Sequence, residues 1–235
     1  MSGSVQLRAI EALNRPSVAD AVFDALHRQI LSLELPPGTK ISEVDVSKAS
    51  GVSRQPVRDA FYRLSKLGFL TIRPQRATCV SVISESAVLQ AQFIRTAIEA
   101  ETVRIACDKL TAADHAALDG LLDQQRQAIR ESRPLDFQAL DDQFHREICE
   151  RSGHGHAWEI IRENKAHMDR VRYLSLAFAS NEAFEDHCKV MDAIRSRNAE
   201  LAVGDMRRHL ARIRTQIVRI RAEHMQYFAQ EPVED

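Results

Sequence analysis

Residues that interrupt helices are distributed unevenly along this chain of 235 residues. Most of the proline, glycine and β-branched residues that interrupt a helical pattern fall in the first third of the chain. The rest of the chain has the periodicity of almost continuous helix. The length allows one large domain or two modest ones, and the change in pattern favours two. We expect a mixed domain over 17–82 and an all-helical domain over 83–230, with an extension at 1–16 and a tail at 231–235.

The first third predicts three helices followed by a β-hairpin. The helices are expected over about residues 17–33, from Ser42 to Gly51, and over 53–67, and the strands over 69–73 and 78–82. Ser17, Ser42 and Ser53 stand where helices need N-caps, and Gly51 breaks the chain before the third helix. The spacing is that of helix, tight turn and helix beside a hairpin.

The helix over 53–67 carries one apolar stripe and one polar face. Such a helix fits the major groove of DNA and reads bases with the exposed side chains near its N-terminus. Arg54 and Arg58 can contact guanine or phosphate. Gln55 can pair with adenine, and Ser53 can donate to a phosphate. The alternative is an ordinary solvated amphipathic helix with two surface arginines.

These residues carry a resemblance to a known family. The winged helix-turn-helix of GntR-type bacterial transcription regulators resembles the segments LPPG at 35–38, GVSRQPVRDA at 51–60, RL at 63–64, GFL at 68–70 and RP at 73–74. The resemblance implies that Arg54 and Arg58 contact operator DNA. It also implies that the wing tip, near Gln75 and Arg76, enters the minor groove. Ala77 departs from the family pattern, which usually has a glycine in the wing.

From about residue 84 onward the pattern predicts six helices and no strand. Their expected ranges are 85–109, 112–131, 135–151, 156–179, 182–196 and 199–229. Pro134 supplies one break, and Asn181 and Asn198 are expected to start helices. Short connections favour an antiparallel helical bundle. The fold class is therefore mainly α, with a winged helix-turn-helix followed by an all-α antiparallel bundle.

Four residues of the helical part have the chemistry of a metal site. Asp141 and His145 stand four residues apart, which places a carboxylate and an imidazole on one helix face. His187 and His209 lie on later helices, beside apolar residues that would turn toward a core. Taken singly, each histidine is more often a hydrogen-bonded core or surface group. Three imidazoles and one carboxylate in a bundle interior would suit a divalent transition metal such as Zn²⁺ or Ni²⁺.

The order and local context of these four residues resemble the metal motif of the FCD effector domain, found in the FadR-like branch of GntR regulators. The resemblance covers residues 84–225 and implies that the four side chains are the metal ligands. His154 and His156 form an H-x-H pair, but they fall in a glycine-containing break outside that motif. We expect surface or structural roles for both.

Arg95 stands where the family places an arginine that holds an effector carboxylate. A buried guanidinium offers a two-pronged donor to such a group, whereas the alternative role is an ion pair with Glu99 on the next turn. Arg172 could supply a second cation. The resemblance therefore implies a small carboxylate effector such as a sugar acid, a hydroxy acid or a dicarboxylate.

Charge and composition restrict the partners and the cellular location that we expect for the protein. Residues 1–82 hold 11 Lys+Arg and seven Asp+Glu, whereas residues 83–235 hold 21 Lys+Arg and 26 Asp+Glu. A modestly basic N-terminal part therefore precedes an acidic C-terminal part. No uncharged stretch exceeds nine residues, and the N-terminus lacks the apolar run of a secretory signal, so we expect a cytoplasmic protein without a membrane partner. The four cysteines stand far apart, which fits reduced thiols.

The preferred interpretation is a ligand-responsive transcription regulator, a repressor as is usual in this family, that binds double-stranded operator DNA as a homodimer and is not an enzyme. Segment 82–86, where the wing meets the first effector helix, is the expected transmission route. A metal-dependent hydrolase or lyase is the alternative, since a bound metal can activate water. A constitutive architectural DNA-binding protein is a third hypothesis, but it does not explain the four candidate metal ligands.

Overall fold

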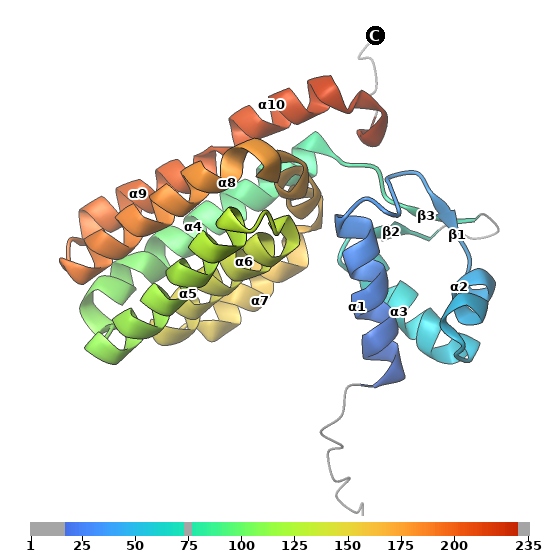
Figure 1. The fold of residues 1–235 in the computed structure, drawn as a ribbon, viewed down its shortest axis with the longest axis horizontal. Coiled ribbons are helices and arrows are strands. Elements are labelled where there is room, and N and C mark those ends of the chain that lie inside the picture. The colour runs from blue at the N-terminus through green and yellow to red at the C-terminus, as the bar shows by residue number, and fades with distance from the viewer. Residues whose placement is uncertain (1–16, 73–76, 230–235) are drawn as a thin grey trace, which may run out of the picture.

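The computed structural model describes residues 17–72 and 77–229 of the chain. Figure 1 shows two units: a small N-terminal unit that holds α1 to α3 with the strands, and a larger bundle that holds the remaining helices. The predicted class, a winged helix-turn-helix followed by an all-helical bundle, is confirmed. None of the described helices is both long and apolar enough to span a membrane.

The N-terminal unit begins with a capped helix. Its elements are α1 (Val18–Leu31), β1 (Lys40–Ile41), α2 (Glu43–Ser50), α3 (Arg54–Lys66), β2 (Leu70–Thr71) and β3 (Thr78–Val80). The Ser17 hydroxyl accepts from the N–H of Asp20, whose carboxylate accepts from the N–H of Ser17 in return, which forms a capping box. Gly51 ends α2 with a φ of 66°, a left-handed conformation that glycine adopts without a Cβ clash. This turn sets α3 at an angle to α2.

The sheet of this unit has three antiparallel strands in the order β1-β3-β2, whereas the sequence predicts only a hairpin. The prediction lacks β1 because two residues are too few to show an alternating pattern. The N–H of Gly38 donates to the carbonyl of Val80 over 2.9 Å, so the turn after α1 leads β1 alongside β3. The two expected strands exist, but both are shorter than predicted.

An apolar core joins α1 to α3. It includes Val22, Leu26, Ile30, Val57, Phe61 and Leu64. Each large apolar side chain that is fully buried contributes about 1.5–3 kcal/mol to stability. Ala166, the first residue of α8 (Ala166–Arg195), belongs to this same cluster although its helix is part of the bundle. The two units therefore share a buried contact in addition to the chain that links them.

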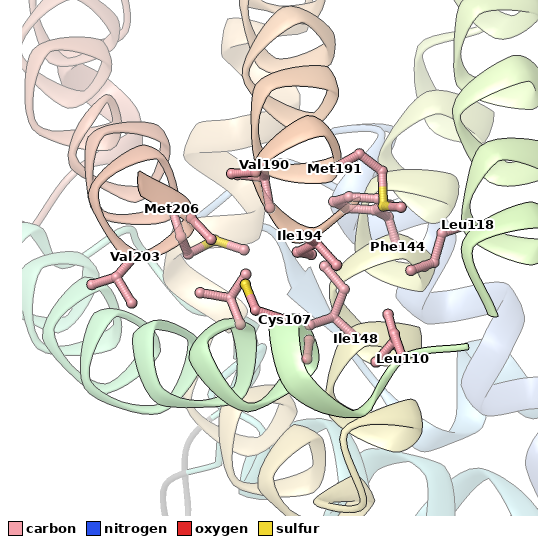
Figure 2. Close-up of a cluster of buried hydrophobic side chains, with 14 of the residues drawn as sticks. Cys107, Leu110, Leu118, Phe144, Ile148, Val190, Met191, Ile194, Val203 and Met206 are labelled. Carbon is pink, nitrogen blue, oxygen red and sulfur yellow. The ribbon is translucent and has the colours of Figure 1, made fainter. Parts of the chain in front are cut away.

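The bundle packs its long helices around a second core. Its other helices are α4 (Glu85–Lys109), α5 (Ala112–Arg130), α6 (Pro134–Arg151), α7 (Gly155–Asn164), α9 (Ala199–Ala211) and α10 (Ile213–Glu223), followed by a 3₁₀ turn, η1 (Met225–Tyr227). Figure 2 shows Phe144 and Ile148 of α6 meeting Met191 and Ile194 of α8 in this core. These contacts fix the rotation of α6 and α8, and with it the direction of the polar side chains beside them.

The predicted break at Asn181 is wrong. Helices were expected over 156–179 and 182–196, whereas the chain breaks at Lys165 and α8 continues without interruption for 30 residues. Asn181 is tolerated inside the helix because no proline or glycine follows it, and tertiary packing outweighs its weak helix propensity. Lys165 turns its ammonium inward, 2.6 Å from carboxylate oxygens of both Asp142 and Asp169.

The last predicted helix, 199–229, is also divided. It breaks at Arg212, between α9 and α10, and the second helix ends at Glu223. The chain beyond it returns to the linker between the two units, where the Ile83 N–H donates to the Tyr227 carbonyl over 2.7 Å. Asn198 caps α9 as expected, since its side chain accepts from the N–H of Leu201. All four cysteines are free thiols.

Candidate metal centre and nucleic-acid interface

Three helices direct the four predicted metal-site residues to one point. Asp141 and His145 come from α6, His187 from α8 and His209 from α9, and one ligand atom of each lies within 4.8 Å of all the others. The Nε2 atoms of His187 and His209 are 3.3 Å apart. Asp141 Oδ1 is 3.6 Å from His187 Nε2, and Asp141 Oδ2 is 3.8 Å from His145 Nε2. The arrangement is a compact set of three imidazoles and one carboxylate.

The outer nitrogen of each imidazole faces an oxygen from another residue. His187 Nδ1 is 2.9 Å from Gln125 Oε1, His145 Nδ1 is 2.5 Å from Glu99 Oε2, and His209 Nδ1 is 3.7 Å from Asp186 Oδ2. The contact of His187 with Gln125 is a hydrogen bond, and an acceptor in this position holds the proton on Nδ1 and leaves Nε2 with its lone pair directed inward. Nδ1 of His145 and Nδ1 of His209 face their carboxylates without hydrogen-bond geometry among the described residues.

Sequence reasoning did not assign this role to Gln125, Glu99 or Asp186. Each lies on a different helix from the histidine it meets, and none belongs to a motif. Glu99 carried the single available signal, its spacing of four from Arg95, and that signal indicated an ion pair only. Phe144 adds a further constraint, because its ring stacks on His187 with centroids 4.7 Å apart.

Protonation in the folded protein favours metal binding. Burial holds the pKa of His187 well below its ordinary value, and the neighbouring His209 lowers it further. Burial also lowers the pKa of His209, although Asp186 opposes this. Burial alone would raise the pKa of Asp141, but Arg172 and the imidazoles lower it below its usual range. Neutral imidazoles and an ionised carboxylate are the forms that ligate a metal.

The donor set fits a divalent transition metal. His145 Nε2 is buried and has no hydrogen-bond partner among residues 17–72 and 77–229. A buried polar atom without a partner is costly, and an ion at the centre of the cluster would satisfy it. Three nitrogen donors and one oxygen donor are ligands that Zn²⁺ and Ni²⁺ both accept.

A cavity of about 50 Å³ opens beside this cluster. Its wall includes Asp141 and His209 of the cluster together with Arg95, Arg172 and Gln216. The structure thus brings both predicted effector-binding arginines to the same space as the metal-site residues.

Arg95 has a divided role. Its Nε donates to Glu99 Oε1 over 2.6 Å, which is the ion pair that the sequence offered as the alternative. Its Nη2, however, is buried and has no hydrogen-bond partner in the described part of the chain. Burial alone would lower the pKa of Arg95, but Glu99 raises it above its ordinary value, so the guanidinium is charged. The ion pair therefore orients Arg95 and leaves a donor for another anion.

Arg172 is surrounded by carboxylates. Its Nη2 donates to Asp141 Oδ2, and its Nη1 lies 2.7 Å from Asp142 Oδ1 and 3.0 Å from Asp169 Oδ1. Burial opposes its charge, but these three carboxylates raise its pKa well above the ordinary value. Arg172 compensates the charge of Asp141, which is a role the sequence did not indicate.

The polar face of α3 is exposed, as the sequence predicted. Arg54 and Arg58 are 59% and 60% exposed and lie 3.4 and 3.5 Å from the same Glu43 oxygen. Gln55 donates to Asp59 over 3.0 Å. Ser53 precedes the helix, and its hydroxyl makes no capping hydrogen bond, so it can donate elsewhere.

The other predicted positions are less informative. Gln75 and Arg76 lie outside the described residues, and Ala77 is exposed. His154 and His156 take no part in the cluster, and His154 Nδ1 lies 3.1 Å from the Ser152 carbonyl. Their expected structural or surface roles agree with this placement.

Comparison with known families and proteins agrees with the fold. Residues 18–80 match the family model described as bacterial regulatory proteins, gntR family, and residues 90–212 match the FCD domain. The chain belongs to the GntR family. It is thus a DNA-binding transcription regulator with an FCD domain, and its families and relatives are regulators and not enzymes. The hydrolase or lyase alternative is therefore excluded.

Several relatives of this GntR regulator cover nearly its whole length. The HTH-type transcriptional repressor RspR of Escherichia coli K12 is 35% identical over 98% of this chain and 100% of its own. A probable D-xylose utilization operon transcriptional repressor of Paenarthrobacter nicotinovorans is 28% identical over 85% of this chain and 88% of its own. The solved structure of E. coli McbR/YncC superposes with a TM-score of 0.71 at 24% identity, covering 89% of this chain and 99% of that one, which shows the shared fold.

Proposed function

We propose that this GntR regulator is a ligand-responsive repressor whose bundle holds Zn²⁺ or Ni²⁺ together with a small carboxylate. The observation that carries the proposal is the shared cavity: the Asp141 and His209 side chains and the partly unpaired Arg95 line one space of about 50 Å³. When bound there, the metal would supply a Lewis acid for one ligand oxygen. Arg95 would supply a fixed donor for another.

The residues of the chain determine which ligands are suitable. Arg95 is held by Glu99, so its free Nη2 cannot follow a badly placed anion. Arg172, bound to Asp141, adds positive charge to the same wall. A cavity of about 50 Å³ has room for only a few water-sized groups, since one water needs about 10–15 Å³ on this measure. These properties favour a compact acid such as a sugar acid, hydroxy acid or dicarboxylate.

The proposed DNA-reading surface is α3 with the wing. Arg54, Arg58 and Gln55 present donors for base edges or phosphates, and Ser53 stands at the helix N-terminus, where a phosphate is favoured. One helix reads only a few base pairs, so a homodimer on a pseudo-palindromic operator supplies the specificity. Two relatives are named as repressors, which supports repression. A bacterial regulator that binds operator DNA is expected to act in the cytoplasm.

A two-step experiment tests this proposal. Metal-loaded protein is heated with a panel of sugar acids, hydroxy acids and dicarboxylates, and each acid that raises the melting temperature is a ligand. The same acid is then added to the complex with a duplex selected from a random pool. We expect at least one acid to stabilise the wild type, to fail with Arg95→Gln, and to change affinity for the duplex. Stabilisation that is equal in both proteins would overturn the role of Arg95, and an unchanged duplex affinity would overturn the regulatory role.

A further inference from the structure

A closed ring of ion pairs lies between the DNA-binding unit and the proposed effector cavity, which is the space of about 50 Å³ lined by Arg95 and Arg172. Arg172 Nη1 binds Asp142 and Asp169 over 2.7 and 3.0 Å, and the Lys165 ammonium binds the same two residues over 2.6 Å each. The side chains of Lys165 and Asp169 are 5% and 6% exposed. Burial alone would raise the pKa of Asp142, but Lys165 and Arg172 lower it to about 2. Two cations and two anions thus compensate one another inside the bundle.

Two hollows, the proposed effector cavity and a cleft, are lined by different members of the ring. Arg172 lines the effector cavity and also binds Asp141. The other three members line a cleft of about 350 Å³ whose opposite wall is formed by the N-terminal unit, including His27 of α1 and Phe69 before β2. The two hollows are therefore in contact with the same buried network.

The N-terminus of α8 docks the bundle onto the DNA-binding unit. Arg170 is fully buried, and its Nη1 donates to the carbonyl of Ser81 in the chain that leaves β3. Its Nη2 lies 2.9 Å from His167 Nδ1, which also accepts from the N–H of Ser84 over 3.2 Å. Ala166 completes the joint, because it packs in the apolar core of the DNA-binding unit.

Three members of the ring and the residues of the joint alternate over Lys165 and the first two turns of α8, whereas Asp142 of the ring lies on α6. Lys165 and Asp169 of the ring each precede a residue of the joint, Ala166 and Arg170 respectively, and Arg172 follows two residues later. A helix of this length is stiff, so a displacement of its ring residues displaces its joint residues as well. Buried polar networks lose much of their stability when one member is withdrawn.

We infer that this ring, acting through the first two turns of α8, is the element that couples the effector cavity to the orientation of the DNA-binding unit. A carboxylate that takes a donor from Arg172 leaves Asp142 and Asp169 without part of their compensation, and the start of α8 rearranges with its docked residues. The inference rests on the proposed function in one respect, because the ligand that perturbs Arg172 is the proposed carboxylate. The linker at 82–86 thus has a second connection, through α8, that the sequence did not reveal.

Hydrogen exchange of the full chain, without metal, ligand or DNA, tests the coupling. Arg172→Gln removes the cation that joins the ring to the cavity, and exchange is followed by mass spectrometry in the segment 78–87. Arg212→Gln is the matched control: Arg212 lines the same cavity but binds Glu182 and Asp186, away from the joint. We expect Arg172→Gln to speed exchange in 81–84 at least about threefold and Arg212→Gln to leave it unchanged.

A second pair of variants distinguishes coupling from general loosening. Arg170→Met opens the joint directly, and adding Arg172→Gln to it is expected to speed exchange no further, since both act on one element. If exchange in α5 also rises in Arg172→Gln, the bundle as a whole has been destabilised. Arg172→Lys, which retains the positive charge but not the two-pronged guanidinium, then replaces Arg172→Gln, and the same increase in exchange is expected.

The coupling would be overturned by wild-type exchange at 81–84 in the Arg172 variant that leaves α5 unchanged, or by an effect no larger than that of Arg212→Gln. The outcome is independent of metal, ligand and DNA, so it is separate from the test of the proposed function.

Discussion

The arginines of α3 and those of the proposed effector cavity have opposite surroundings. Arg54 and Arg58 are 59% and 60% exposed and share one oxygen of Glu43, whereas Arg95 and Arg172 are 3% and 12% exposed and bind carboxylates of their own. An exposed ion pair contributes little, so the α3 arginines can leave Glu43 for DNA at small cost. A buried pair is costly to break, so the cavity arginines keep a fixed geometry until a ligand competes for their donors. The same residue type therefore serves an adaptable surface and a rigid pocket.

Removing a proposed metal ligand is expected to cause the largest loss in this series. The loss is in metal binding by the buried cluster, and the exposed arginines of α3 should be unaffected. His187→Ala should lower metal affinity more than about 100-fold, beyond the 10–100-fold loss typical of outer partners, because it deletes a direct donor. Elemental analysis of the purified protein measures the resulting loss of bound metal. His154→Ala is the control and should retain metal. Full metal content in a variant lacking Asp141, His145 and His187 together would place the site elsewhere.

Acid should weaken the joint between the two regions. Burial and the neighbouring charge of Arg170 lower the pKa of His167 from 6.5 to about 4. Its Nδ1 accepts from Ser84 and Arg170 only while it is unprotonated. The folded pKa is below the unfolded one, so this contribution to stability is complete above pH 6.5 and is lost as the pH falls toward 4.

Between pH 7 and pH 4, the wild type should lose about 2–3 kcal/mol more unfolding free energy than His167→Gln. Urea denaturation of the metal-free proteins at both pH values provides the measurement. Parallel losses in the two proteins would show that His167 does not titrate in this window.

Arg58→Ala tests the adaptable surface. It should weaken binding to a selected duplex by about 1–3 kcal/mol if the guanidinium reads a base edge, with relaxed preference at one position. A loss that is similar for all sequences, with a shallower salt dependence, would indicate a phosphate contact. Fluorescence anisotropy measures both properties. Arg130→Ala removes the same charge from an exposed site on the bundle and should have no effect. Wild-type affinity in Arg58→Ala would contradict either DNA contact.

Removal of an outer partner should give the smallest effect of the series. Gln125→Leu deletes the oxygen that faces His187 Nδ1, so metal affinity should fall about tenfold while the ligands themselves remain. Competition with a chelator measures the change. Gln124→Leu alters the preceding, exposed residue of α5 and should leave the affinity unchanged. An equal affinity in both variants would show that the His187 tautomer needs no support from Gln125.

Local signals in the sequence predicted much of the fold. Caps at Ser17, Ser42 and Asn198, and the left-handed turn at Gly51, stand where the structure has them, because each depends on a few adjacent residues. The break at Asn181 was predicted from the same kind of signal and is wrong. Packing of the continuous α8 against its neighbours outweighs a residue that is only weakly unfavourable in a helix.

The sequence by itself determined which helix faces are apolar and that Asp141 and His145 share one face, because a period of 3.6 residues fixes both. The meeting of those two residues with His187 and His209 was expected from resemblance. Only the tertiary structure decided which groups surround them: Glu99 and Gln125 reach the cluster from other helices, and Lys165 closes an ion-pair ring with Arg172. Periodicity specifies the rotation of a helix about its own axis, whereas the partners of its polar side chains depend on how the apolar core sets neighbouring helices in register.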